Sequence, residues 1–252
     1  LLWSRFGVDC GNYVEPFFGS GAVYLNRPAS FSGWATLNDL SGHVANFWRA
    51  MAADPDAVAR AADWPVNEAD LHARHLWLVT HHDRIADRLA ADPAYYEAQA
   101  AGWWAWGACL WIGGGWCAGD GPWRAEPDEE GVPVLVNGNG GKGVARQLPH
   151  LGDGGKGDRL AWLTDWFRQL QACLRDARIA CGSWERICSP GTMTRNGLCA
   201  VLLDPPYSLT KAVYAHDSST VSGDVREWCK TNGSNPLLRI ALCGHAGEGH
   251  EE

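Results

Sequence analysis

The hydrophobic and polar positions of the first fifty residues predict a strand, a tight turn, a helix, a second strand and a second helix. Buried strands and helical spacing alternate here, and two glycines mark the turn. The segments are a strand at 12–18, a turn at 19–21, a helix starting at 22–26, a strand at 35–40 and a helix at 41–53. This order is typical of the opening of a doubly wound parallel sheet.

The rest of the chain predicts a return to the same sheet after a long insertion. Residues 66–99 have mainly helical spacing, whereas residues 102–157 are rich in Gly and Trp and lose clear periodicity. Beyond Arg159 we predict a helix to Leu174, strands at 177–182, 198–203 and 238–243, and a short helix at 225–230. We therefore expect an α/β, Rossmann-like core from residues 1–64 and 159–252, with an inserted region at 65–158.

Composition and charge narrow the class of protein. Hydrophobic residues make up 46% and charged residues 20% of the 252 residues, which allows a packed core. The net charge of −8 disfavours nonspecific nucleic-acid binding by the whole surface. We interpret the tryptophans between Trp103 and Trp116 as core packing rather than base stacking. With no apolar run long enough for a membrane span and no secretory signal, we expect a cytoplasmic protein that binds no membrane.

The cysteines and histidines do not form a recognisable metal motif. The 9 Cys include no CxxC pair, and the spacing of Cys173, Cys181, Cys188 and Cys199 does not match a zinc finger or ribbon. We interpret them as reduced, structural thiols. His72, His75, His81 and His82 occur without an HExxH motif, and we expect solvated or capping roles for them. We expect no metal.

The first chemical motif is the glycine turn. Gly19 and Gly21 let a ligand approach the backbone closely, and Asp39 stands at the end of the next predicted strand, where a carboxylate can accept both ribose hydroxyls of a nucleoside. Tyr24 stands where a GxGxxG fingerprint needs its third glycine. The incomplete fingerprint disfavours NAD or FAD and favours a nucleoside cofactor without a pyrophosphate.

The second motif, Asp204-Pro205-Pro206-Tyr207, directly follows a predicted buried strand. Two prolines cannot continue a central ladder, so the chain must leave the sheet in a rigid loop with free carbonyls. The Asp204 carboxylate and the Pro205 carbonyl can accept both hydrogens of an exocyclic amine, and Tyr207 offers a face for stacking a base. An amine held in this way is positioned to attack a methyl sulfonium.

Together, Glu15-Pro16-Phe17-Phe18-Gly19-Ser20-Gly21, then Asn38-Asp39, then Asp204-Pro205-Pro206-Tyr207 resemble the Dam-like DNA adenine methyltransferase family. The resemblance covers nearly the whole chain and includes the order of motifs, with a target-recognition insertion between them. It implies transfer of a methyl group from S-adenosylmethionine to adenine N6 of a base flipped out of double-stranded DNA.

The resemblance also implies roles for individual residues. Asp204, Pro205, Pro206 and Tyr207 would bind the flipped adenine. Cofactor contacts are expected at Pro16, Phe17, Gly19, Gly21, Asp39, Ser183 and Asp204. Ser183 stands where the family carries an Asp that holds the cofactor adenine. We expect a partial or degraded member, because the sequence begins without Met, lacks the family's usual cofactor-contacting N-terminal segment and ends before a closing hairpin.

A Gly-rich, locally basic stretch supplies candidate DNA contacts. Lys142, Arg146, His150 and Lys156 lie in it, and such side chains can follow phosphates. Two alternatives stay open. One is an N4-cytosine DNA methyltransferase, whose target amine has similar chemistry. The other is a catalytically impaired remnant that still binds DNA or cofactor.

Overall fold

The computed structural model describes residues 1–112, 115–117, 123–137, 158–206 and 221–244. The chain divides into two compact units, and each is described by itself. Unit 1 takes in the described residues within Leu1–Leu40, Cys173–Lys211 and His216–Glu252, and unit 2 those within Ser41–Ala172. We expected residues 41–64 and 159–172 in the core with the sheet, but they cluster with unit 2.

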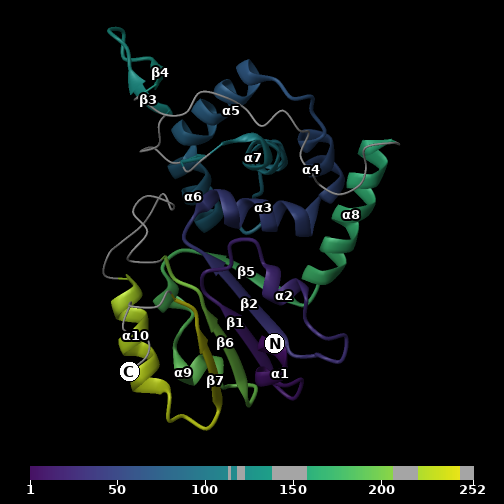
Figure 1. Ribbon diagram of the computed structural model, residues 1–252, viewed down its shortest axis with the longest axis vertical. Coiled ribbons are helices and arrows are strands. Elements are labelled where there is room, and N and C mark those ends of the chain that lie inside the picture. The colour runs from purple at the N-terminus through teal and green to yellow at the C-terminus, as the bar shows by residue number, and fades with distance from the viewer. Residues whose placement is uncertain (113–114, 118–122, 138–157, 207–220, 245–252) are drawn as a thin grey trace. The chain divides into compact units, whose positions relative to one another are not determined.

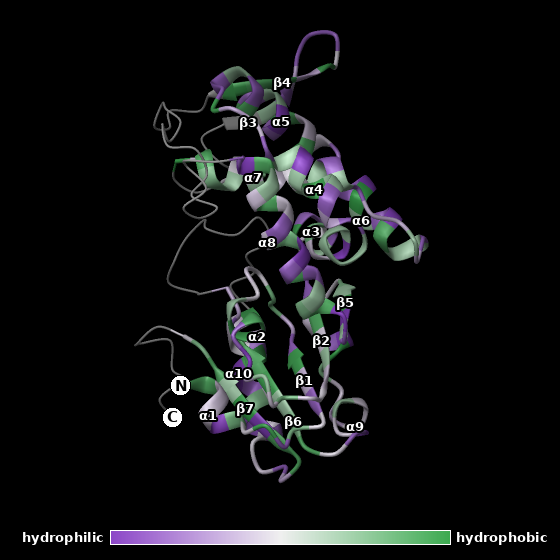
Figure 2. Ribbon diagram, turned by 90° about the vertical axis from the view of Figure 1, so that its right-hand side faces the viewer, coloured by the Kyte–Doolittle hydropathy of each residue, from purple (hydrophilic) through white to green (hydrophobic). Residues whose placement is uncertain are grey.

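Unit 1 is built on a five-stranded, all-parallel sheet of order β5-β2-β1-β6-β7 (Figure 1). The strands are β1 (Asn12–Glu15), β2 (Trp34–Asp39), β5 (Ala177–Cys181), β6 (Cys199–Leu203) and β7 (Leu238–Leu242). All five were predicted from the sequence to within a few residues. The fully buried run of β6 is apolar along its length (Figure 2), as expected for a parallel strand covered on both faces.

Helices cover both faces of this sheet. They are α1 (Leu2–Phe6), α2 (Ala22–Leu25), a 3-10 turn (Trp184–Arg186), α9 (Pro190–Met193) and α10 (Val221–Asn232). On one face Val14, Val201 and Leu203 pack with α9 and α10. On the other, Tyr13 stacks between Trp3 and Tyr24, at ring-centroid distances of 5.1 and 5.8 Å. Successive strand residues point to opposite faces, so the buried residues of β1 serve both layers.

Unit 2 is mainly helical. It contains α3 (Gly42–Ala53), α4 (Pro55–Ala62), α5 (Glu68–Thr80), α6 (His82–Ala91), α7 (Ala98–Leu110) and most of α8 (Arg159–Leu174), with an antiparallel hairpin of β3 (Trp123–Pro127) and β4 (Pro133–Asn137). Local signals start several helices. Asp54 accepts a hydrogen bond from the Ala57 N–H at 3.0 Å, and Asn67 caps α5 through Ala69 and Asp70.

The sequence missed α7, which we had placed in the irregular insertion. This helix packs against α4 through Gly102, where a Cβ would lie 2.4 Å from the Ala61 Cβ, so only glycine permits the approach. Trp106 is fully buried, and the Trp116 ring lies over Gly107. These observations confirm the core-packing interpretation for Trp106 and Trp116, whereas Trp103 is only partly buried and lines a cavity.

One of the four histidines in and after α5 does not have the solvated or capping role that we expected. His81 follows the last residue of α5 and contacts the Trp77 carbonyl oxygen, which fits a capping role. His75, in contrast, is fully buried, stacks on Trp111 at 4.5 Å and accepts a hydrogen bond from the Cys117 N–H. It is a core residue because its ring fills space between two indoles.

The described residues show neither a metal cluster nor a membrane span. Among them, no group of three or more His, Cys, Asp or Glu side chains could hold a metal ion. Cys188 and Cys199 lie in the sheet core, where burial raises the pKa of each thiol to about 12 and disfavours the thiolate that zinc requires. No helix in the described part of the chain is both long and apolar enough to cross a bilayer.

Candidate functional site

The strand order places both sequence motifs at the same point of the sheet. The chain runs from β1 outward to β2 and β5, and then returns to the other side of β1 as β6, followed by β7. The direction of winding therefore reverses between β1 and β6. In open α/β sheets, ligands bind beyond the carboxyl ends of the strands at such a reversal. The Gly19 turn follows β1 and Asp204 follows β6, so the two motifs flank it.

The glycine turn after β1 has the backbone conformation that its sequence predicts. Gly19 and Gly21 have φ of 45° and 68°, in the left-handed region that favours glycine. The Gly21 N–H donates to the Phe18 carbonyl at 2.8 Å, which closes the turn. A Cβ built on Gly19 would meet nothing within 4 Å. Gly19 is thus required by its φ and leaves open space beside the backbone.

Asp39 holds this turn against the end of β2. Its Oδ2 accepts a hydrogen bond from the Gly19 N–H at 2.9 Å, and the Phe18 N–H donates to the Asn38 carbonyl at 2.8 Å. The carboxylate that we predicted as a ribose ligand therefore also fixes the position of the glycine turn. Its contact with a ribose stays a prediction.

Asn38 connects the ends of three strands, a role that was not predicted from the sequence although Asn38 was quoted as part of the second motif segment. Its side-chain amide donates to the Pro16 carbonyl at 3.0 Å and to the Gly182 carbonyl at 2.9 Å. Pro16 follows β1 and Gly182 follows β5, and β2 lies between these strands. Asn38 is 1% exposed. A buried amide at the end of a parallel strand is the signal that could have identified it.

Two acidic side chains and a thiol gather at the ends of β1, β6 and β7. Glu15 is buried, and its Oε2 accepts a hydrogen bond from the Tyr13 hydroxyl at 2.8 Å. Burial raises the pKa of the Glu15 carboxyl to about 8; the Tyr13 hydrogen bond opposes this shift and the nearby charge of Asp204 adds to it. Burial, with Asp204 and Glu15, raises the pKa of the Cys243 thiol to about 11.

The sequence indicated only part of this cluster. Asp204 was predicted as a site residue. Glu15 was quoted as part of the first motif without a role of its own, and Cys243 was not named. A carboxyl group at the end of an otherwise apolar central strand is the signal that points to Glu15, because such a group is rarely buried without a role.

The proline corner after β6 has the expected form as far as it is described. Asp204 is exposed, Pro205 is buried and Pro206 is partly buried, directly after the last residue of β6. The sheet continues on the β7 side through the Cys243 N–H, which donates to the Leu203 carbonyl at 2.8 Å. Tyr207 lies outside the described residues.

The remaining predicted cofactor contacts lie at the same edge of the sheet. Phe17 is half-buried and faces the Trp184 ring at a centroid distance of 6.3 Å. Ser183 is exposed, just beyond β5, and its hydroxyl donates to the Glu185 carboxylate. The predicted DNA contacts Lys142, Arg146, His150 and Lys156 lie outside the described residues.

Comparison with known proteins gives no relative: the chain matches no protein-family model and no curated protein.

Proposed function

We propose that unit 1 binds S-adenosylmethionine at the β1–β6 reversal and transfers its methyl group to the exocyclic N6 of adenine in DNA. The observation that carries the proposal is the meeting of the glycine turn and the Asp204-Pro205-Pro206 corner at one reversal of the sheet. Neither motif alone selects this chemistry, but their combination supplies a nucleoside site beside two oxygen acceptors.

The charge of the site suits a cationic cofactor. Asp39 ends β2 and Asp204 follows β6, so two carboxylates flank β1 at this edge, whereas the raised pKa of Glu15 keeps that carboxyl protonated at neutral pH. The cation Arg186 lies on the β5 side, where it donates to the carbonyl of the last residue of β5. An acidic edge disfavours the pyrophosphate of NAD or FAD and favours a sulfonium. Open space at Gly19 leaves room for a ligand against the backbone. The residues present therefore fit S-adenosylmethionine, which when bound would supply a methyl group on a positively charged sulfur.

The protein's own part in the reaction is to hold the target amine. The Asp204 carboxylate and the Pro205 carbonyl accept its two hydrogens, which directs the nitrogen lone pair away from them. Two consecutive prolines restrict the backbone, so these acceptors are positioned before the base arrives. Formation of the N–CH3 bond would go with loss of the S–CH3 bond, which would leave a neutral thioether. The amine then loses one proton, and the exposed position of Asp204 gives that proton a route to solvent.

The test is methyl transfer by the full chain from labelled S-adenosylmethionine to mixed-sequence double-stranded DNA, followed by nucleoside analysis. We expect N6-methyladenine, and loss of at least about a hundredfold in rate for Asp204→Ala, which removes one of the two acceptors for the amine. Asp9→Ala is the matched control. Asp9 precedes β1 at the opposite edge of the sheet and pairs with Arg239 at 2.8 Å.

Each other outcome has a defined meaning. Detection of N4-methylcytosine in place of N6-methyladenine would show that the target base is cytosine. Cofactor binding with no transfer to any base would establish the impaired remnant instead. Equal rates for Asp204→Ala and Asp9→Ala would show that the Asp204 carboxylate plays no part in the reaction.

A further inference from the structure

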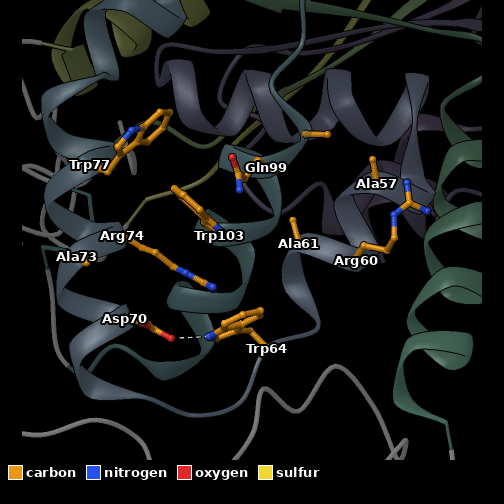
Figure 3. A pocket seen from close by; sticks show the side chains of 11 residues that line it. Ala57, Arg60, Ala61, Trp64, Asp70, Ala73, Arg74, Trp77, Gln99 and Trp103 are labelled. Atoms are coloured by element: carbon orange, nitrogen blue, oxygen red, sulfur yellow. Dashed lines mark hydrogen bonds between the residues drawn. The ribbon is translucent and has the colours of Figure 1, made fainter.

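A second candidate site lies within unit 2, in a cavity of about 820 Å³ bounded by α4, α5 and α7. Figure 3 shows its wall of aromatic and charged side chains, with Arg74 extending from α5 between Trp103 and Trp64. Arg60 on α4 and Gln99 on α7 line it as well. Its volume lies in the range of small-molecule sites. No motif in the sequence pointed to it.

Arg74 is the residue of this cavity that most clearly indicates a ligand. It is only 8% exposed, and its Nη1 has no hydrogen-bond partner among the described residues. Its guanidinium lies 4.4 Å from the Trp106 ring centroid, 4.9 Å from that of Trp64 and 5.2 Å from that of Trp103. Ring faces attract a cation, but they do not replace the hydrogen-bond acceptors that a buried guanidinium loses with water.

The acid nearest in sequence does not neutralise Arg74 by a direct ion pair. Asp70 lies one helical turn earlier on α5, and its Oδ2 accepts a hydrogen bond from the Trp64 Nε1–H at 2.5 Å. Burial lowers the pKa of Arg74, against a raising effect of Asp70. A structural cation would be expected to have a carboxylate in contact. An anionic ligand in the cavity would supply the missing counter-charge.

The rest of the wall indicates what the anion is attached to. Trp64 is 42% exposed, and Trp77 and Trp103 are partly exposed and meet edge to face at 5.5 Å. Such indoles offer faces on which a flat ring can stack. The exposed Arg60 and Gln99 add a second cation and an amide that can both donate and accept.

We propose that this cavity binds a nucleotide, with its phosphate at Arg74 and its base against the exposed tryptophan faces. The nucleotide is either a free mononucleotide or an unpaired nucleotide within a DNA strand, since both present the same phosphate and base. The proposal does not rest on methyl transfer, because every residue that carries it belongs to unit 2.

The test is calorimetric titration of the full chain with AMP and CMP, with adenosine and ribose 5-phosphate to separate the base and phosphate contributions. We expect both mononucleotides to bind, and each fragment to bind more weakly. Arg74→Met, which keeps an unbranched apolar stem among the indoles, should weaken AMP binding about tenfold or more. Arg60→Gln, at an exposed position, should weaken it less.

Arg88→Met is the matched control, because Arg88 stacks on Tyr95 at 4.1 Å but does not line the cavity. It should bind AMP as the unmodified chain does. Competition by a short single-stranded oligonucleotide would identify a nucleotide within a strand as the ligand, and its absence would identify a free nucleotide. No binding of either mononucleotide, or equal binding by Arg74→Met and Arg88→Met with both folded, would overturn the proposal.

Discussion

At the scale of single residues, the buried carboxyl of Glu15 makes the stability of the chain depend on pH. In the unfolded chain this group loses its proton near its ordinary pKa of 4.5, whereas in the folded chain it keeps the proton up to about pH 8. Between these values the folded state binds more protons. The free energy of unfolding therefore falls as the pH rises through this window, by at most about 1.4 kcal/mol per pH unit from this group.

Glu15→Gln should remove this fall in the free energy of unfolding, because the amide does not titrate and its oxygen can still accept a hydrogen bond from the Tyr13 hydroxyl. Urea unfolding at pH 5 and at pH 8 measures the effect. The variant should gain stability relative to the original chain between the two pH values, by about a few kcal/mol. A constant difference between the two proteins would show that Glu15 titrates alike in the folded and unfolded states.

At the scale of elements, the packing of α7 on α4 depends on the absence of a side chain at Gly102. An added Cβ would lie 2.4 Å from the Ala61 Cβ and 2.7 Å from the Val58 carbonyl oxygen. Gly102→Ala should therefore destabilise the chain by about 1–3 kcal/mol in spite of the higher helix propensity of alanine. Gly223, within α10, is the control, because a Cβ there meets nothing within 4 Å.

For that reason Gly223→Ala should stabilise the chain by about 0.5–1 kcal/mol. Thermal unfolding of both variants beside the original chain measures the two effects. Equal shifts of the melting temperature would show that helix propensity, and not the α4–α7 contact, governs both positions.

The same helix shows where sequence prediction reaches its limit. The strands of unit 1 could be predicted because β-type apolar runs are bounded by turn residues, as at Gly19 and Pro205. In α7 apolar and small residues occur on all sides, and its buried positions are not confined to one stripe: they are Ala100, Ala101, Gly102, Trp106, Gly107 and Leu110. Without one apolar stripe there is no helical period to detect. Composition alone then suggested an irregular insertion.

The residues of the candidate site also divide into those that the sequence could predict and those that it could not. Asp39 and Asp204 could be predicted because they end strands that the sequence itself delimits. Asn38 and Glu15 could not, since their roles come from partners in other strands, the Gly182 carbonyl and the Asp204 charge. The cavity around Arg74 was equally out of reach, because the wall joins residues of three helices, and one of these helices was missed.

At the scale of the whole molecule, the two proposals assign different ligands to different units, and hydrogen exchange can separate them in one experiment. S-adenosylmethionine should slow exchange in peptides that cover Glu15–Gly21 and Cys199–Asp204, which hold the glycine turn and the strand end that leads into the proline corner. AMP should instead protect peptides from α4, α5 and α7. Ligand binding raises the free energy of local opening only in the segments that the ligand stabilises.

Arg74→Met and Gly19→Ala give that experiment its internal controls. Arg74→Met should lose the protection by AMP and keep the protection by S-adenosylmethionine, because Arg74 lines only the cavity of unit 2. Gly19→Ala places a side chain in the open space beside the turn at a left-handed φ, so it should show the reverse pattern. Protection of unit 2 alone by S-adenosylmethionine would place the cofactor in the wrong unit for methyl transfer at Asp204.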